Sequence, residues 1–272
     1  MLTNIYDSHT HSLNSHDGVN SVDEMCKYAL ENGIKGFALT DHCELDLFSD
    51  PVIQKGVKNS FLDMERAKEA YGDRLLLSSG VELGQMILDE DLRQSILKAS
   101  NYDFVLGSMH CIVGKSDFCM YDYSKWELSD IYKLLEKYYE EMSRTVRLGG
   151  FDSFAHITYP LRYIEGEFGI KIDITKYEDY IDDVLKTLAQ NGKALEINTS
   201  GLRQKIGKTM PTMDYAKRFK SYGGELITLG SDAHRTTDMS KGIAETMESL
   251  KEIGFTHYAF FKERKPNMIE IK

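Results

Sequence analysis

The sequence predicts an α/β fold in which parallel strands close, or nearly close, into a barrel. Three observations support this prediction: seven short apolar runs of strand length, helical stretches between them, and polar side chains placed repeatedly where the runs end. Short runs rich in β-branched and aromatic residues are typical of buried strands, and their alternation with helices favours parallel β/α packing. The runs cover residues 4–7, 36–40, 75–81, 102–107, 151–155, 194–198 and 226–230.

The helical stretches carry start and stop signals. Ser21 and Glu24 form a capping-box pattern at the start of the first helix, and Asn32 with the glycine after it is a turn signal at its end. Residues 131–148 and 177–190 have the apolar periodicity of longer amphipathic helices. Each stretch therefore connects two successive strands, as a barrel requires.

Composition excludes several classes of protein. The chain has 272 residues, 42% of them hydrophobic, which is enough for one large barrel without support from disulfides. Its four cysteines form no C-x-x-C pair, and there is neither a signal-peptide pattern nor an apolar run of about 18 residues for a membrane span. No linker or repeat interrupts the pattern, so we expect residues 1–272 to form a single cytoplasmic domain. The sequence does not indicate an oligomeric state.

Histidine and carboxylate side chains are concentrated at the carboxyl ends of the runs. They are His9, His11, His42, Glu82, His110, His156, Asp232 and His234. Because the carboxyl ends of barrel strands meet on one rim, we expect these side chains to lie together. Random placement would not put such residues after six of seven strands, and mixed imidazole and carboxylate donors favour zinc, manganese or iron. The sequence therefore predicts a shared metal site.

Two sets of residues within this group indicate more than one ion. His9 and His11 are two residues apart on a strand, so both imidazoles point the same way and can face one ion. Asp17, His42 and His234 are candidates for a further, nitrogen-rich site beside it. Asp17 has a competing interpretation as a turn residue, because a glycine follows it.

Three other polar residues receive lesser roles. Asp41 is expected to be a hydrogen-bond partner of the ligands or a cap at the strand end, rather than a ligand. The role of His16 stays open, with the pocket wall as one interpretation. His257 lies in a late apolar segment and is expected to be structural.

Taken together, these motifs resemble the polymerase-and-histidinol-phosphatase (PHP) family. The matching pieces run in family order at residues 7–11, 16–18, 39–42, 80–82, 107–110, 155–156, 196–198 and 230–234. The resemblance implies a distorted seven-stranded, TIM-like β/α barrel with three divalent ions (zinc, manganese or iron) at the carboxyl ends of the strands. It implies a first ion on His9, His11, Glu82 and Asp232, a second on Glu82, His110 and His156, and a third on Asp17, His42 and His234.

Within the family, the chain is similar to the short, free-standing histidinol-phosphate phosphatases. That similarity implies hydrolysis of L-histidinol phosphate to L-histidinol and phosphate in histidine biosynthesis. A metal-bridging hydroxide would attack phosphorus, because metal binding lowers the pKa of water enough to generate a nucleophile at neutral pH. His42 and His234 are weak candidates for the general acid, since a metal-bound imidazole is a poor acid, and a metal-bound water is an equal candidate.

Three residues on the same rim are candidates for binding the phosphate. Arg162 and Arg203 follow strand ends, and the planar fork of arginine matches phosphate oxygens, although surface ion pairs are the competing interpretation. Ser231 is either a hydrogen-bond donor to phosphate or a plain strand-end serine. For the imidazole and amine of the substrate, Asp122, Tyr159 and Glu165 are candidates by position alone.

Two alternative functions stay open. One is a related phosphoesterase or exonuclease with another substrate, and the other is a non-catalytic metal-binding scaffold. A net charge of −10 and the lack of a basic aromatic groove argue against nucleic acid as a partner. Bound cations would offset that charge locally, so a small-molecule phosphate monoester is the expected partner. No ligand position of the family is missing, which argues against the scaffold.

Overall fold

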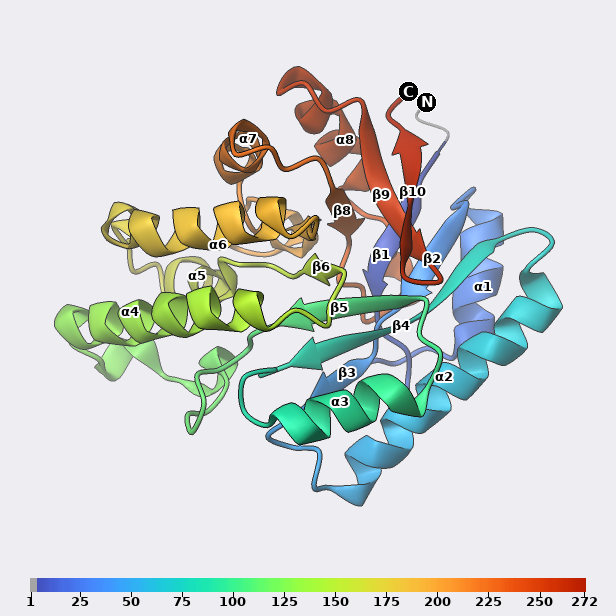
Figure 1. Ribbon diagram of the computed structural model, residues 1–272, viewed down its shortest axis with the longest axis horizontal. Coiled ribbons are helices and arrows are strands. Elements are labelled where there is room, and N and C mark those ends of the chain that lie inside the picture. The colour runs from blue at the N-terminus through green and yellow to red at the C-terminus, as the bar shows by residue number, and fades with distance from the viewer. Residues whose placement is uncertain (1–3) are drawn as a thin grey trace.

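A parallel sheet curled into a barrel is the centre of the molecule (Figure 1). The computed structural model describes residues 4–272. Residues 1–3, the start of the segment considered for a signal peptide, lie outside the described residues. The strand order is β1-β2-β4-β5-β6-β7-β8, and every adjacent pair is parallel. The strands are β1 Tyr6–Thr10, β2 Gly36–Leu39, β4 Leu76–Gly84, β5 Phe104–Ser108, β6 Ser153–Phe154, β7 Ala194–Asn198 and β8 Ile227–Gly230.

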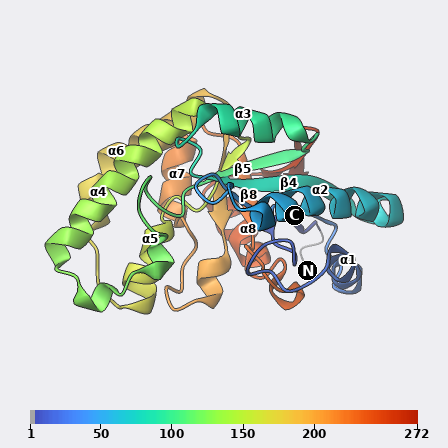
Figure 2. The same cartoon turned by 90° about the horizontal axis from the view of Figure 1, so that it is seen from below.

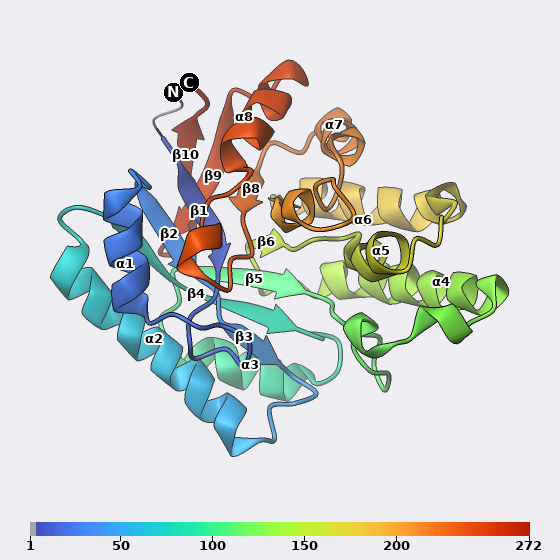
Figure 3. The same cartoon turned by 180° about the vertical axis from the view of Figure 1, so that it is seen from behind.

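The first and last strands of this order lie side by side, which closes the barrel (Figures 1 and 3). The amide of His11 donates to the carbonyl of Ala233 at 2.8 Å, and the amide of Asp232 donates to the carbonyl of His9 at 2.8 Å. All seven predicted strands are present, so the predicted barrel is confirmed. Its closing hydrogen bonds lie at the carboxyl ends of the strands, among the predicted ligands.

Two strand ends differ from the prediction. Pairing against β4 stops after Leu39 and resumes in a short extra strand, β3 (His42–Glu44). The strand predicted to end at residue 81 continues to Gly84, because β3 and β5 supply partners on both sides of that extension. Glu82 therefore lies inside β4 rather than after it, opposite His42.

Helices cover the outside of the barrel, with α4 and α6 on one side and α1 and α2 on the other (Figures 1 and 2). Their bounds are α1 Val22–Glu31, α2 Pro51–Tyr71, α3 Glu90–Ala99, α4 Leu128–Thr145, α5 Tyr159–Leu161, α6 Glu178–Gln190, α7 Met213–Ser221 and α8 Ile243–Glu252. A π-helical turn spans Arg162–Glu167, and short 3-10 turns span Phe118–Met120, Tyr123–Lys125, Val146–Leu148, Ile174–Tyr177, Ser200–Arg203 and Thr236–Asp238. Within residues 4–272, none of the helices has the length and apolar character needed to cross a membrane.

The predicted helix boundaries are largely confirmed. The capping box of α1 is formed, since the side chains of Ser21 and Glu24 each accept a hydrogen bond from the other residue's backbone amide. The helix predicted over 177–190 is α6. The one predicted over 131–148 begins three residues earlier, and its last three residues tighten into a 3-10 turn.

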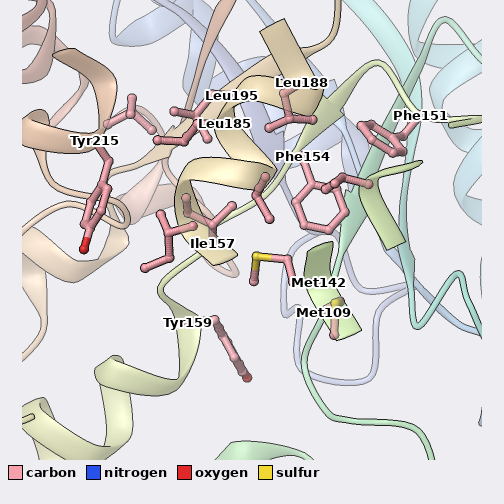
Figure 4. Packing of buried hydrophobic residues seen from close by; sticks show 14 of the residues in the cluster. Met109, Met142, Phe151, Phe154, Ile157, Tyr159, Leu185, Leu188, Leu195 and Tyr215 are labelled. Carbon is pink, nitrogen blue, oxygen red and sulfur yellow. The ribbon is translucent and has the colours of Figure 1, made fainter. Parts of the chain in front are cut away.

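A large apolar cluster holds the helices against the strands (Figure 4). Met142 of α4, Leu188 of α6 and Phe154 of β6 are fully buried within it. Phe154 ends β6 and stands two residues before the predicted ligand His156. Its packing therefore fixes the carboxyl end of the strand from which this ligand projects.

A C-terminal hairpin was not predicted from the sequence. Strands β9 (His257–Lys262) and β10 (Lys265–Glu270) pair antiparallel through a turn at Glu263 and Arg264, which have φ values of 51° and 61°. Two successive positive φ values are typical of a type I′ turn, but such turns favour Asn and Gly, so this sequence gave no turn signal. His257 lies at the start of β9 and bonds to its neighbour Thr256, consistent with the structural role expected for it.

Replacing Arg264 by alanine is expected to destabilise the protein without changing its chemistry. The Arg264 guanidinium donates to the buried carboxylate of Asp152 at 2.5 Å and to the carbonyl of Gly150 at 2.9 Å. Asp152 immediately precedes β6, so this contact lies at the barrel end opposite the predicted metal site. We expect a loss of about 1–3 kcal/mol in the free energy of unfolding, because the buried Asp152 carboxylate loses its charged donor and keeps only the amide of Val105. Chemical denaturation would measure it, and a change in metal content would contradict the account.

Candidate metal centre

The structure brings the predicted ligands together at the carboxyl rim of the barrel. Each comes from a strand or from the segment directly after it, and most are buried. The buried ones are His9, His11, Glu82, His110, His156 and Asp232, whereas Asp17, His42 and His234 are partly exposed. His16 is 62% exposed and lines the adjoining cleft, which is the role left open for it.

The first donor cluster consists of His9, His11, Glu82 and Asp232. The Nε2 atom of His9 lies 3.3 Å from Oε2 of Glu82 and 3.8 Å from Oδ1 of Asp232. The Nε2 atom of His11 lies 3.6 Å and 3.5 Å from the same two oxygens. Donors at about 2.0–2.2 Å from a tetrahedral ion lie about 3.3–3.6 Å from one another. The spacing of these four atoms therefore suits one cation between them.

The second donor cluster uses the other oxygen of Glu82. Oε1 of Glu82 lies 3.2 Å from Nε2 of His110 and 3.0 Å from Nε2 of His156, and these two nitrogens are 3.3 Å apart. The three atoms form a triangle with edges close to those expected around a single ion. Glu82 thus presents one oxygen to each cluster, as a bridging carboxylate does.

The third donor cluster, Asp17, His42 and His234, is more open. Oδ2 of Asp17 lies 3.0 Å from Nε2 of His234, and Oδ1 lies 3.7 Å from Nε2 of His42. Asp17 is 43% exposed on the loop after β1. The ring of His11 stacks on the ring of His234 at 4.2 Å, so this cluster adjoins the first.

Several of these donor atoms lack a hydrogen-bond partner although they are buried. They include Nε2 of His9, Nε2 of His11, Oε2 of Glu82 and Nε2 of His234. A buried polar atom left unpaired costs about 1–3 kcal/mol, and native structures rarely contain many. Cations shared among these atoms would satisfy all of them. The donor set therefore fits divalent metal ions.

The electrostatics of the centre keep its carboxylates ionised. Although burial alone would raise the pKa of Glu82, the imidazoles of His9 and His110 lower it well below the ordinary value. For Asp232, burial is likewise outweighed, and the neighbouring imidazoles lower its pKa well below the ordinary value. An ionised carboxylate is the form that coordinates a metal, so both residues are ready to bind without first losing a proton.

Two of the predicted ligands are held in strained backbone conformations. His156 has a φ of 25° and Asp232 a φ of 52°, in a region that residues other than glycine rarely adopt. Such conformations cost of the order of 1–3 kcal/mol each and persist only where surrounding contacts impose them. At Asp232 the contact is the hydrogen bond from its amide to the carbonyl of His9. Strain concentrated on two predicted ligands is typical of a functional site.

Two buried glutamates beside the predicted ligands were not identified as site residues from the sequence. Oε1 of Glu44 lies 2.8 Å from Nδ1 of His110. Although burial alone would raise the pKa of Glu44, the His110 imidazole lowers it to about 2. Glu196, noted in the sequence only as part of a motif, lies 2.6 Å from Nδ1 of His9. The signal available was a carboxylate in or at the end of an apolar strand, since Glu44 ends β3 and Glu196 lies in the middle of β7.

Asp41 has the supporting role expected for it. Its carboxylate accepts hydrogen bonds from the amide of Ser12 at 2.6 Å and from the hydroxyl of Ser15 at 2.9 Å. The hydroxyl of Ser15 in turn accepts from the amide of His42 at 3.0 Å. Asp41 thus fixes the loop after β1 against the start of β3, and it is not part of any donor cluster.

The two arginines predicted to bind phosphate have different surroundings. Arg162 lines the cleft beside the metal centre, with one guanidinium nitrogen 3.5 Å from Oδ2 of Asp232. Arg203 donates to the backbone carbonyls of Ser231 and Asp232 at 2.7 and 2.8 Å. Arg162 therefore lines the cleft with one ion pair to a predicted ligand, whereas Arg203 holds two consecutive backbone carbonyls in place.

Ser231 is not placed to contact phosphate, which corrects one of the two interpretations left open for it. It is fully buried, and its hydroxyl donates to the carboxylate of Asp7 at 2.5 Å while its amide donates to the same residue at 2.9 Å. A serine has one hydroxyl proton, and this one is used. Ser231 is a structural strand-end residue.

Replacing Arg203 by alanine is expected to lower stability more than it lowers substrate affinity. The carbonyls of Ser231 and Asp232 would each lose the hydrogen bond from Arg203, at a cost of about 1–3 kcal/mol. The unfolding midpoint should fall, and the loosened segment should also weaken metal binding. Thermal denaturation of the metal-free and metal-loaded variant would measure both. An unchanged midpoint with a raised KM would instead assign Arg203 to the substrate.

A cleft of about 550 Å³ opens directly onto the metal centre. Its wall combines the tyrosines Tyr159 and Tyr163 with the carboxylates of Asp46 and Asp117. Tyr159, a candidate by position, donates to Asp117 at 3.1 Å. The other two positional candidates are not in this wall: Asp122 pairs with Lys125, and Glu165 pairs with Lys208. Asp46 and Asp117 were not identified from the sequence, because their place depends on how two loops fold over the rim.

The fold and the site together define the class of protein. It is a parallel β/α barrel whose carboxyl rim carries adjoining clusters of imidazole and carboxylate donors, able to hold more than one divalent cation. Comparison with known proteins identifies the family within that class. The chain belongs to the PHP domain family, whose sequence model matches residues 7–200. The resemblance noted from the sequence is thereby confirmed.

Individual relatives extend the match over nearly the whole chain. A probable histidinol-phosphatase of Thermotoga maritima is 30% identical over 253 residues, 93% of this chain and 94% of the relative. One of Clostridium acetobutylicum is 30% identical over 241 residues, 85% of this chain and 86% of the relative. Among solved structures, the histidinol phosphate phosphatase of Lactococcus lactis, complexed with zinc, L-histidinol and phosphate, has a TM-score of 0.78 at 23% identity. That match covers 97% of this chain and 98% of the other.

Proposed function

We propose that the chain, acting as a single domain, is a histidinol-phosphatase that hydrolyses L-histidinol phosphate to L-histidinol and phosphate. The main support for phosphate-ester hydrolysis is the position of Glu82, whose two oxygens face separate groups of imidazoles. Two cations on either side of one carboxylate are the arrangement used to hydrolyse phosphate esters. The relatives named above support the choice of substrate.

Three divalent ions of zinc, manganese or iron are proposed for the three donor clusters. When bound, they would supply an activated water and neutralise the charge of the phosphoryl group. The chain positions the ester against them. Arg162 lies beside Asp232 at the mouth of the centre, where its planar fork can hold two phosphate oxygens.

The two cysteines of the cleft are not competing nucleophiles. Cys111 and Cys119 line it, but burial raises the pKa of both thiols, that of Cys119 to about 12, so neither is a thiolate at neutral pH. Direct attack by water without a covalent enzyme intermediate is therefore proposed.

The proton for the leaving alkoxide is not assigned to His42 or His234. Both nitrogens of His42 face carboxylates, Nδ1 toward Glu82 at 2.9 Å and Nε2 toward Asp17 at 3.7 Å. His234 directs Nε2 toward Asp17 and Nδ1 toward the carbonyl of Asp232. Each ring nitrogen of the two residues thus faces a carboxylate or a carbonyl, so water in the cleft is the proposed proton source.

The wall of the cleft suits the organic half of histidinol phosphate. The substrate carries an amine and an imidazole, both of which can be cationic. The carboxylates of Asp46 and Asp117 supply opposite charge, and the ring of Tyr159 supplies an aromatic face next to His110. The acidic character of this wall disfavours a polyanionic substrate such as single-stranded DNA.

An assay of three substrates tests the proposal. Metal-free protein reconstituted with Mn²⁺ or Zn²⁺ would be given histidinol phosphate, a generic aryl phosphate and single-stranded DNA. We expect kcat/KM for histidinol phosphate to exceed that for the aryl phosphate by about 100-fold or more, as a site with specific polar contacts allows. Comparable values for all three would overturn the substrate. Less than one ion per chain together with no hydrolysis would favour the non-catalytic scaffold.

A further inference from the structure

We infer that Glu196 is a positioning residue shared by the first two donor clusters, fixing His9 for one ion and His156 for the other. The inference deepens the proposed function and rests on its metal centre. Glu196 lies in β7 and is fully buried. None of the three sets of ligands expected from the sequence contains it.

One oxygen of Glu196 sets the orientation of His9. Oε1 lies 2.6 Å from Nδ1 of His9. A carboxylate accepts a hydrogen bond, so a neutral His9 ring that donates to it carries its proton on Nδ1 and keeps its lone pair on Nε2. The Nε2 atom is the one that faces Glu82 and Asp232. Glu196 therefore selects the tautomer of His9 that can bind an ion in the first cluster.

The other oxygen of Glu196 holds the backbone at His156. Oε2 accepts a hydrogen bond from the His156 amide at 2.9 Å. That residue has a φ of 25°, a conformation that an L-residue adopts only when its surroundings impose it. The conformation turns the imidazole so that Nε2 reaches Oε1 of Glu82 at 3.0 Å. Through the backbone, Glu196 thus places a ligand of the second cluster.

Glu196 itself is not placed as a metal ligand. His9, His156 and Glu196 together have donor atoms close enough to hold an ion. Both oxygens of Glu196 are nevertheless occupied, Oε1 by His9 and Oε2 by the His156 amide and by the side-chain amide of Asn198 at 3.3 Å. An ion there would have to displace these donors, whereas Nε2 of His9 is buried and unpaired on its other side.

A glycine in the neighbouring strand makes the contact possible. At Gly230 of β8, an added Cβ would clash with both Oε1 of Glu196 and Cβ of His9. The close approach of Glu196 to His9 therefore requires the absence of a side chain at this position. Gly230→Ala is accordingly a second way to disturb the Glu196–His9 contact without changing either partner.

Titration of the intact, metal-free protein with Co²⁺, followed by visible absorption, tests the inference. In Glu196→Gln the side chain keeps its shape, but one acceptor becomes an NH₂ group that faces a donor. We expect the dissociation constants of the two tightest ions each to rise about 10–100-fold, as loss of such orienting partners does. Glu196→Asp keeps two acceptor oxygens and should be closer to the wild type than Glu196→Gln.

Asp103→Asn is the matched control. Asp103 is a buried carboxylate that also accepts backbone amides, but it precedes β5 at the opposite end of the barrel. Its loss should lower the unfolding midpoint and leave Co²⁺ affinity unchanged. If Glu196→Gln destabilises the protein yet binds both ions as tightly as the wild type, the inference is overturned. Should Glu196→Gln not fold, Glu196→Asp and Gly230→Ala are expected to weaken both ions, and wild-type affinity in both would overturn it.

The titration needs no substrate, so it separates this inference from the proposed function. A wild type that binds Co²⁺ but does not hydrolyse histidinol phosphate would contradict the function alone. A wild type that binds fewer than two ions would overturn the metal centre and this inference together.

Discussion

Replacing Glu82 by glutamine is expected to remove both ions of the bridged pair and nearly all activity toward histidinol phosphate. Each oxygen of Glu82 serves a different cluster, and an amide offers one neutral oxygen and an NH₂ group in their place. Loss of a single electrostatic contact to a transition state costs about 10²–10³-fold in kcat. Because the change at Glu82 affects two ions at once, we expect a larger loss in kcat/KM.

Elemental analysis and steady-state kinetics on the same preparation would measure this effect. The control is again Asp103→Asn, a buried carboxylate outside the site, which should keep its metal and its kcat/KM. Retention of both ions by Glu82→Gln would contradict the bridging role. Retained metal with lost activity would assign Glu82 to the chemistry rather than to the binding of the ions.

Replacing Arg162 by alanine is expected to lower kcat/KM by about 10²–10³-fold while leaving the metal content unchanged. The Arg162 guanidinium lies at the mouth of the centre and is 24% exposed. Unlike Arg203, it does not hold a backbone carbonyl in place. The substitution should therefore lower the free energy of unfolding only slightly. Arg162→Lys should recover only part of the loss, because an ammonium group cannot form the two parallel hydrogen bonds of a guanidinium.

Inhibition by inorganic phosphate gives a second measurement of the same contact. If Arg162 holds the phosphoryl group, the inhibition constant of phosphate should rise in Arg162→Ala along with the loss in kcat/KM. Arg235→Ala, which removes a neighbouring exposed arginine of the rim, is the matched control. Equal phosphate inhibition in wild type and Arg162→Ala would contradict the assignment.

Most of the fold could be predicted because each strand is apolar, short and followed by a helix with clear signals. The ligands could be predicted for a related reason: parallel strands deliver their carboxyl ends to one rim, so a histidine such as His110 or His156 is placed by its strand. Glu82 was recognised although its strand continues two residues further, because a side chain within the last few residues of a strand still reaches the rim.

What could not be predicted depends on contacts between elements distant in sequence. The role of Glu196 requires knowing that His9 and His156 lie on either side of β7's carboxyl end. Ser231 was left open because its partner, Asp7, lies 224 residues away across the barrel closure. The β9–β10 hairpin was missed because its turn, at Glu263 and Arg264, lacks the residues that favour positive φ.

In the proposed centre, the carboxylate of Glu82 bridges two ions on the rim of this barrel, beside a phosphate site. Anomalous scattering from crystals grown with Zn²⁺ and phosphate tests it most directly. We predict two peaks on either side of Glu82, one among His9, His11 and Asp232 and the other against His110 and His156, with phosphate within reach of Arg162. The lack of a peak on either side of Glu82 would contradict the claim, whether or not a third ion lies among Asp17, His42 and His234.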